Sequence, residues 1–225
     1  MNERTTEFNL NLIELPKLNR VESPSGRTYV TPEGNSYPSV TTVLGKTLDK
    51  SGLDAWRKRI GEKEADKQSK YAANRGTIVH DLCEDLILNR DVNLKGLMPI
   101  PLAMYRQFEK ILRQNVDNVR GSELFLYSDK LKVAGATDLI ADWNGVTSVI
   151  DFKTSGKHKK REWIDSYFLQ CALYSYMMWE RTGVICKNLV VIIGVEMASE
   201  PQVFIEDMKD WIPRAMELCK TFHQK

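Results

Sequence analysis

The stretch Ile150-Asp-Phe-Lys-Thr154 ends an apolar run with an acidic residue, one spacer and a lysine. A second strand-like run, Gly135–Ile140, lies upstream of it. Between the two runs stands Asn144-Gly145, the strongest short signal for a two-residue β-hairpin turn. A turn at this pair joins two antiparallel strands and sets Asp138 opposite Asp151 on one face of a sheet.

Two carboxylates that face each other repel, so a stable fold needs a cation beside them. Lys153 meets this need, because it lies two residues after Asp151 and shares its face. Carboxylate oxygens suit Mg²⁺ or Mn²⁺, which would polarise a phosphate and activate water. The pattern therefore indicates a metal site for phosphate chemistry, with ordinary strand-end acids as the alternative. We also expect Asp138→Asn to remove the repulsion and to raise the melting temperature in metal-free buffer.

The composition of the 225 residues is that of a globular protein, with 42% hydrophobic residues and a net charge of +2. This charge is too small to indicate a nucleic-acid partner by itself. The four cysteines are too widely spaced for a zinc or iron–sulfur framework, which predicts reduced core cysteines. No apolar run is long enough to span a bilayer, so we expect no membrane association. The segment Met1–Glu7 is typical of neither a secretory signal nor a transit peptide.

The order of hydrophobic patterns predicts an α/β fold with a mixed central β-sheet, flanked by helices, and an N-terminal helical lobe. We expect one integrated domain with an extended segment at 1–37, which has a possible strand at Arg27–Val30, a helical lobe at 38–120 and a core at 121–225. Ser39 is expected to cap a short helix. The further helices are expected at Gly52–Gln68, Ala72–Leu88, Leu102–Asn118, Trp163–Arg181 and Met208–Phe222. The strands are expected at Glu123–Tyr127, Val133–Asp142, Val146–Phe152, Leu189–Val195 and, at an edge, Val203–Ile205.

Other polar residues on these elements are candidates for the same site. His80 lies on a predicted helix and imidazole is a common metal ligand, although a helix histidine is more often structural. Gln170 and Tyr174 are four residues apart and therefore share one helix face. The alternative for this pair is the polar stripe of an amphipathic helix.

The basic run Lys157-His-Lys-Lys-Arg161 directly follows the acidic strand. Such a run is usually a solvated loop. Beside a metal site, its cations would attract a polyanion through the release of counterions. Trp163 and Tyr167 would add stacking for the bases of a single strand.

Taken in order, these residues resemble the RecB-type branch of the PD-(D/E)XK nuclease superfamily. The ordered set is Gly76-x3-His80, Glu123, Gly135-x2-Asp138, Asp151-Phe-Lys153-Thr154 and Gln170-x3-Tyr174. The segments Tyr37–Leu44 and Leu53-x2-Trp56 are similar to the mitochondrial genome maintenance exonuclease group and its phage and bacterial relatives. The order of the five motifs is specific, whereas each motif alone is not.

This resemblance implies a restriction-endonuclease-like fold and a role for each matched residue. It implies His80, Asp138 and Asp151 as ligands of Mg²⁺ or Mn²⁺, together with the backbone carbonyl of Phe152. It implies Lys153 as the catalytic lysine and Glu123 as an accessory acid. Gln170 and Tyr174 would organise the site and the DNA. For substrate binding we add Thr154 and the cations of the basic run, which are Lys157, Lys159, Lys160 and Arg161.

The function expected from the resemblance is a metal-dependent DNA exonuclease in replication, recombination or repair, which prefers single strands or ends. An endonuclease of the same fold is the first alternative, and a non-catalytic nucleic-acid-binding subunit is the second. No P-loop is present, so an ATP-driven motor would be a separate replication or recombination protein. We expect a cytoplasmic protein of bacterial or phage origin in preference to a mitochondrial one.

Overall fold

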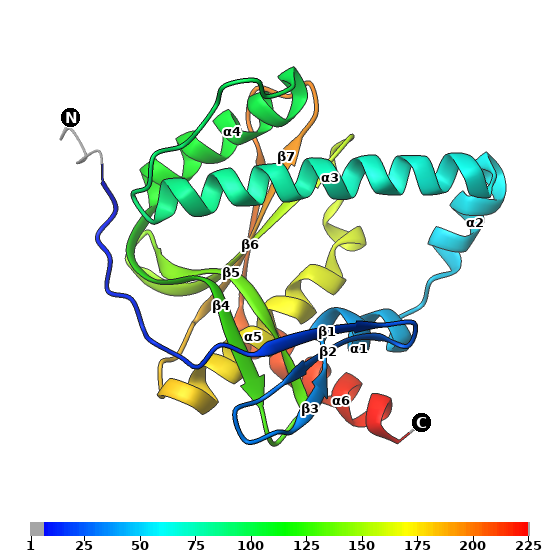
Figure 1. Cartoon of the computed structure of the whole chain (residues 1–225), viewed down its shortest axis with the longest axis vertical. Coiled ribbons are helices and arrows are strands. Elements are labelled where there is room, and N and C mark those ends of the chain that lie inside the picture. The colour runs from blue at the N-terminus through cyan, green and yellow to red at the C-terminus, as the bar shows by residue number, and fades with distance from the viewer. Residues whose placement is uncertain (1–6, 225) are drawn as a thin grey trace.

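A five-stranded mixed sheet forms the centre of the computed structural model, which describes residues 7–224 (Figure 1). Its strand order is β4-β5-β6-β7-β8, in which only β6 and β7 run parallel. The bounds are β4 Val116–Ser128, β5 Val133–Trp143, β6 Val146–Ser155, β7 Asn188–Val195 and β8 Gln202–Asp207. The segment Met1–Glu7, which is expected to be neither a secretory signal nor a transit peptide, lies outside the described part except for Glu7. Within that part, no helix is long and apolar enough to cross a membrane.

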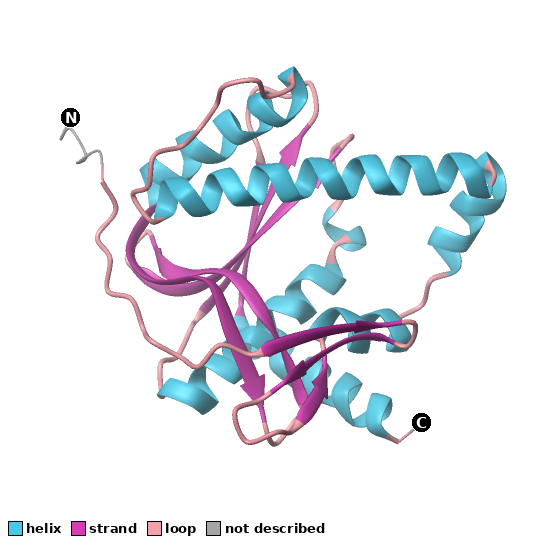
Figure 2. Cartoon of the chain, in the orientation of Figure 1, coloured by secondary structure: helices cyan, strands magenta, loops and turns pink. Residues whose placement is uncertain are grey.

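Helices cover both faces of this sheet, and each face has its own apolar core beneath the helices (Figure 2). On one face lie α1 (Val40–Thr47), α5 (Asp165–Thr182) and α6 (Met208–His223). On the other lie α3 (Glu62–Ile87) and α4 (Pro99–Asn115). Ser39 caps α1 by accepting a hydrogen bond from the Thr42 N–H, as expected. The α/β class and the flanked mixed sheet are therefore confirmed.

The β5–β6 hairpin has the register that Asn144-Gly145 predicts. The two turn residues have φ angles of 49° and 81°, as a type I′ turn requires. Pairing runs from Trp143↔Val146 to Leu139↔Ile150 and ends there. Beyond this point β5 stays paired with β4 and forms an isolated bridge from Ala134 to Ser39, whereas β6 stays paired with β7. We call this separation the strand fork.

Asp138 and Asp151 are the first residues past the strand fork. They are not a ladder pair, which corrects the sequence prediction of directly opposed carboxylates. Instead, the backbone N–H of Phe152 donates to Asp138 Oδ2 at 2.7 Å. The register was predictable because a two-residue turn fixes it, but the turn says nothing about where the strands part.

Two predicted helices differ from those observed. The helix predicted at Gly52–Gln68 is broken at Gly61, whose φ of 84° is left-handed. It therefore divides into α2 (Ser51–Ile60) and the first part of the 26-residue α3, which also contains the helix predicted at Ala72–Leu88. Arg57 holds the two helices at this bend through ion pairs with Glu62 and Asp66.

The boundaries between α4 and β4 were also predicted wrongly. The helix begins at Pro99 rather than Leu102, because proline is tolerated in the first turn, where its missing N–H has no helical acceptor. It ends at Asn115, and β4 starts at once rather than at Glu123. A β-bulge interrupts β4 between Asp117 and Gly121, so its period-2 pattern is hard to recognise.

The N-terminal segment contains more structure than the single strand expected. It forms a three-stranded antiparallel sheet of β1 (Asn19–Ser23), β2 (Gly26–Val30) and β3 (Ser36–Pro38). Ahead of it, the Asn11 N–H donates to the Val119 carbonyl on β4 at 2.8 Å. The segment thus covers the outer edge of the main sheet, which would otherwise be free to pair with another chain.

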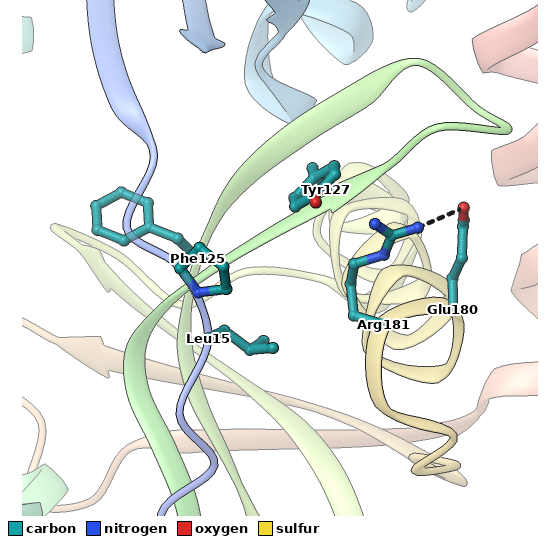
Figure 3. A pocket seen from close by; sticks show the side chains of 6 residues that line it. Leu15, Phe125, Tyr127, Glu180 and Arg181 are labelled. Carbon is teal, nitrogen blue, oxygen red and sulfur yellow. Dashed lines mark hydrogen bonds and ion pairs between the residues drawn. The ribbon is translucent and has the colours of Figure 1, made fainter. Parts of the chain in front are cut away.

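A small pocket of about 220 Å³ lies where this segment crosses β4 (Figure 3). The Arg181 guanidinium lies 4.4 Å from the Tyr127 ring and pairs with Glu180, as Figure 3 shows. Asp129 is a second ion-pair partner of Arg181 at 3.1 Å. Two carboxylates thus pair with this single guanidinium, so the pocket offers no unpaired cation for an anionic ligand.

The α2 helix and the first half of α3 project from the body (Figure 1). No residue of α2 is buried, and residues 66–74 of α3 are all exposed. The rest of α3 packs on the sheet through buried residues such as Val79 and Leu86. The range 38–120 therefore includes helices of the sheet's own core, and its description as a helical lobe of one integrated domain remains a prediction.

Candidate metal centre and nucleic-acid groove

Three acidic residues occupy matching positions on three neighbouring strands at the strand fork. The pairing on either side sets Glu123 of β4 opposite Asp138 of β5. Asp138 and Asp151 of β6 stand one residue past the last β5–β6 pair. Glu123 has a left-handed φ of 48°, which is rare for residues other than glycine and costs energy. This backbone conformation marks Glu123 as a candidate functional residue.

His80 joins this group from α3. Ligand atoms of His80, Glu123 and Asp138 all lie within 4.8 Å of one another. His80 Nδ1 is 3.5 Å from Asp138 Oδ1, and the His80 ring contacts the Phe152 ring edge-on at 5.8 Å between centroids. One imidazole and two carboxylates are a donor set that suits a divalent cation.

Asp151 lies beside this cluster and is held by two donors. Its Oδ1 accepts hydrogen bonds from Lys153 Nζ at 2.6 Å and from Gln170 Nε2 at 3.1 Å. Its Oδ2 is 2.5 Å from the same ammonium but receives no properly directed hydrogen bond from any residue in 7–224. A buried carboxylate oxygen that lacks a donor fits a site that takes a metal ion, so the residues present suit Mg²⁺ or Mn²⁺.

Burial and neighbouring charges shift the pKa values of four ionisable groups of this site, which are His80, Glu123, Asp138 and Asp151. Burial lowers the pKa of His80, but the Asp138 carboxylate outweighs it and raises that pKa to about 9. Burial acts to raise the pKa of Asp138, yet His80 and Lys153 hold it below its usual range. Partial desolvation and repulsion from Asp138 raise the pKa of Glu123 to about 7. Burial, only partly offset by Lys153, raises the pKa of Asp151 to about 6.

Tyr174 has a different place from Gln170. It is 4% exposed, and its ring lies against Gly135 on β5. A Cβ at position 135 would lie 2.8 Å from the Tyr174 hydroxyl oxygen, so only glycine allows this approach. Gln170 thus contacts an acid of the site directly, whereas Tyr174 packs against the strand that carries Asp138.

The basic run divides into two groups. Arg161 is engaged within the fold, because it pairs with Glu206 at 2.7 Å and lies 4.5 Å from the Phe168 ring. Lys157 and Lys159 instead line a cavity beside the site. Lys160 is exposed and lies 5.4 Å from the ring of Trp163.

That cavity, which we call the groove, has a volume of about 610 Å³ and lies between the projecting helices and the ends of β6 and β7. It adjoins the acids, because the lining residue Tyr167 has the Lys153 ammonium 5.2 Å from its ring. The lining consists of Leu53, Trp56, Gln68, Ser69, Tyr71, Ala72, Arg75, Thr154, Ser155, Gly156, Lys157, Lys159, Tyr167 and Glu196. Aromatic rings and cations therefore share one surface next to the candidate metal centre.

The sequence did not predict three residues of this groove, which are Arg75, Tyr71 and Glu196. A signal for Arg75 was present, since it directly precedes Gly76 and is four residues before Val79, on the buried face of α3. Glu196 had no signal, because it follows β7 at a distance of more than a hundred residues from α3 along the chain.

The comparison with curated proteins points in the same direction as this geometry. This chain is similar to mitochondrial genome maintenance exonuclease 1. The mouse protein is 31% identical over 132 residues, which are 56% of this chain and 39% of that protein. The human protein is 28% identical over 143 residues, 60% of this chain and 42% of that protein. The Xenopus tropicalis protein is 27% identical over 162 residues, 68% of this chain and 43% of that protein.

The chain thus spans less than half the length of these curated exonuclease relatives. No family model matches it. The similarity indicates a nuclease family, while the assignment of individual residues to roles has to come from the geometry at the strand fork.

Proposed function

We propose that this protein is a metal-dependent nuclease of the PD-(D/E)XK type that acts as a DNA exonuclease. The observation that carries the proposal is the cluster of His80, Glu123 and Asp138 beside the buried Asp151–Lys153 pair. The names of the similar proteins support exonuclease activity. A purely structural set of charges would have no need for three acids at one fork, one of them on a strained backbone.

Each side chain has a role in phosphodiester hydrolysis. Bound Mg²⁺ or Mn²⁺ would polarise the scissile phosphate and lower the pKa of a water. His80, Asp138 and Asp151 would hold the ion, as the resemblance implies, and Glu123 would be a further ligand. The Phe152 carbonyl would complete this set. Lys153 is oriented by Asp151 and would stabilise the charge that develops on the phosphate.

The groove would bind the strand that is cut. Lys157 and Lys159 would neutralise phosphates, and Thr154 would donate to them. Trp56, Tyr71 and Tyr167 would stack on bases, which favours a single strand or a frayed end over a closed duplex. Lys160 and the 60% exposed Trp163 would extend this surface. Arg161, Gln170 and Tyr174 would act through the position of neighbouring groups.

Lys153→Ala tests the catalytic role. We expect cleavage of an end-labelled single strand to fall by at least about a hundredfold, the effect of removing one group that stabilises transition-state charge. Binding of the same strand without metal should change little. Lys110→Ala, on the exposed face of α4, is the matched control. Wild-type activity should stop with a chelator and return with Mg²⁺ or Mn²⁺. Undiminished cleavage by Lys153→Ala would overturn the proposed mechanism.

A circular single strand separates the two nuclease alternatives. An exonuclease leaves the circle intact and degrades its linear form, whereas an endonuclease of the same fold cuts both. A non-catalytic binding subunit would retain the strand and cut neither. We also propose that this nuclease works with a separate replication or recombination protein. It would be a bacterial or phage-encoded protein of the cytoplasm rather than a mitochondrial one.

A further inference from the structure

Arg75 is a buried cation with too few partners. Its side chain is 5% exposed, and its Nη1 pairs with Glu196 Oε1. Its Nε has no hydrogen-bond acceptor among the residues that the structure describes. The guanidinium also lies 5.6 Å from the Tyr71 ring. A guanidinium carries five N–H donors, and a buried one is costly unless acceptors satisfy them. At least one of these donors, the Nε–H, therefore lacks an acceptor.

The position of this ion pair suggests where those acceptors come from. Arg75 and Glu196 both line the groove, and Lys157 and Lys159 line it as well. Glu196 is the only acid in this lining. It follows β7, and its backbone N–H donates to the Ser155 carbonyl at 3.0 Å. Its side chain is 22% exposed, so its carboxylate can turn towards water while Arg75 stays enclosed.

We propose that Arg75 binds a phosphate of the nucleic-acid strand, and that Glu196 forms an ion pair with the Arg75 guanidinium only while the groove is empty. A phosphate offers several oxygens in a geometry that a guanidinium matches, so it would supply the missing acceptors. Glu196 would then be released to solvent. This inference rests on the proposed function, because it assumes that a strand enters the groove.

The alternative is a purely structural role, in which the ion pair acts as a strut that stabilises the projecting helix. Residues 66–74 of α3 are exposed, so Arg75 is the first buried residue after this stretch, at the base of the projecting helix. A strut would stabilise this helix whether or not nucleic acid is present. It would affect folding and affinity, but it would not release counterions from the strand. The salt dependence of binding therefore distinguishes the two roles.

The experiment measures the binding of a fluorescent single-stranded oligonucleotide by anisotropy, with a chelator, at a series of salt concentrations. Each phosphate contact on a single strand contributes about 0.7 to the slope of log K against log[salt]. We expect Arg75→Gln to reduce the slope by about this amount, and Arg75→Lys to retain it, since lysine keeps the charge. Arg106→Gln, an exposed arginine on α4, should leave the slope unchanged.

Glu196→Gln provides the second test, and it does not require removal of the arginine. The wild type has to break the Arg75–Glu196 ion pair when the phosphate binds and the variant does not, so we expect roughly twofold to fivefold tighter binding by the variant. Glu200→Gln, at an exposed acid shortly after β7, is the matched control. Because glutamine leaves Arg75 in place, this variant remains informative if Arg75→Gln does not fold.

Two results would overturn the inference. A folded Arg75→Gln variant with the wild-type slope would assign the pair to the strut, and weaker binding by Glu196→Gln would show that Glu196 supports the bound state. Both readouts are independent of cleavage. A wild type that binds but does not cleave in Mg²⁺ or Mn²⁺ would refute the proposed nuclease and leave this inference standing.

Discussion

Asp138 Oδ2 accepts a 2.7 Å hydrogen bond from the backbone N–H of Phe152, across the point where β5 and β6 separate. This bond replaces the ladder contact that the separating strands have lost. The other carboxylate oxygen of Asp138 lies 3.5 Å from His80 Nδ1. Ionised Asp138 is therefore stabilised by its neighbours, although Asp151 lies nearby. The like-charge repulsion expected from the sequence is not the dominant interaction of this residue.

Asp138→Asn should consequently lower the stability of the metal-free protein, the reverse of what the sequence suggested. The amide loses the charge that faces His80 and weakens the bond from Phe152. We expect the free energy of unfolding to fall by about 1.5–3 kcal/mol, as for a hydrogen bond to a charged group. Urea unfolding with a chelator measures this, and Asp91→Asn at an exposed position is the control. An unchanged or higher stability would restore the repulsion argument.

Glu123→Gln should weaken the binding of Mn²⁺. Glu123 is one of the three groups whose ligand atoms lie within 4.8 Å of one another, and the amide removes its charge. We expect at least about a tenfold loss of affinity, since even the outer partners of a metal ligand are worth that much. Titration calorimetry without DNA gives the affinity, and Glu200→Gln serves as the control. An unaltered affinity would limit the ligands to His80, Asp138 and Asp151, as the resemblance alone implies.

Much of the site was predictable because local rules fix it. Asn144-Gly145 determines the hairpin register and therefore which residues of β5 and β6 share a face. Lys153 had to lie beside Asp151, because residues two apart on a strand share a face. The order of motifs also brought Gln170 into the site, where it donates to Asp151.

The rest depends on contacts that local patterns do not encode. The strand fork lies where β6 loses β5 as a partner while it keeps β7 and β5 keeps β4, and no local sequence pattern marks this position. Glu123 has a left-handed backbone that no propensity would assign to a glutamate inside a strand. The pair of Arg75 and Glu196 joins a helix to a strand end far away in the sequence.

Gly135→Ala should destabilise the protein through Tyr174. The added Cβ would lie 2.8 Å from the tyrosine hydroxyl and 2.9 Å from a ring carbon, so the buried ring has to move. We expect a loss of about 1–3 kcal/mol, the usual cost of overpacking a core. Gly52→Ala is the matched control, because its Cβ would meet nothing within 4 Å in α2 and alanine favours a helix. Thermal unfolding of both variants tests the contrast, which equal melting temperatures would contradict.

Asp142→Asn should lower the stability of the protein at neutral pH. The variant should also lose less stability in acid than the wild type does. The Asp142 carboxylate accepts hydrogen bonds from Asn118 at 2.8 Å, from Arg120 at 2.6 Å and from Thr147 at 2.8 Å. Burial opposes ionisation, but these donors hold the pKa of Asp142 below its ordinary value of 3.8. The contribution of ionised Asp142 to folding stability is therefore complete above pH 3.8. It is lost as the pH falls through the lowered pKa of the folded state.

The substitution should cost about 1–3 kcal/mol at pH 7, because it removes a charged acceptor and leaves Arg120 without its carboxylate. The difference from the wild type should narrow as the pH falls below 3.8, where the wild-type carboxyl also becomes neutral. Urea unfolding across this pH range measures both effects. Asp117→Asn, an exposed acid at the same bulge, should change little at any pH. A constant difference between wild type and Asp142→Asn from neutral to acid pH would show that ionised Asp142 does not hold the bulge of β4.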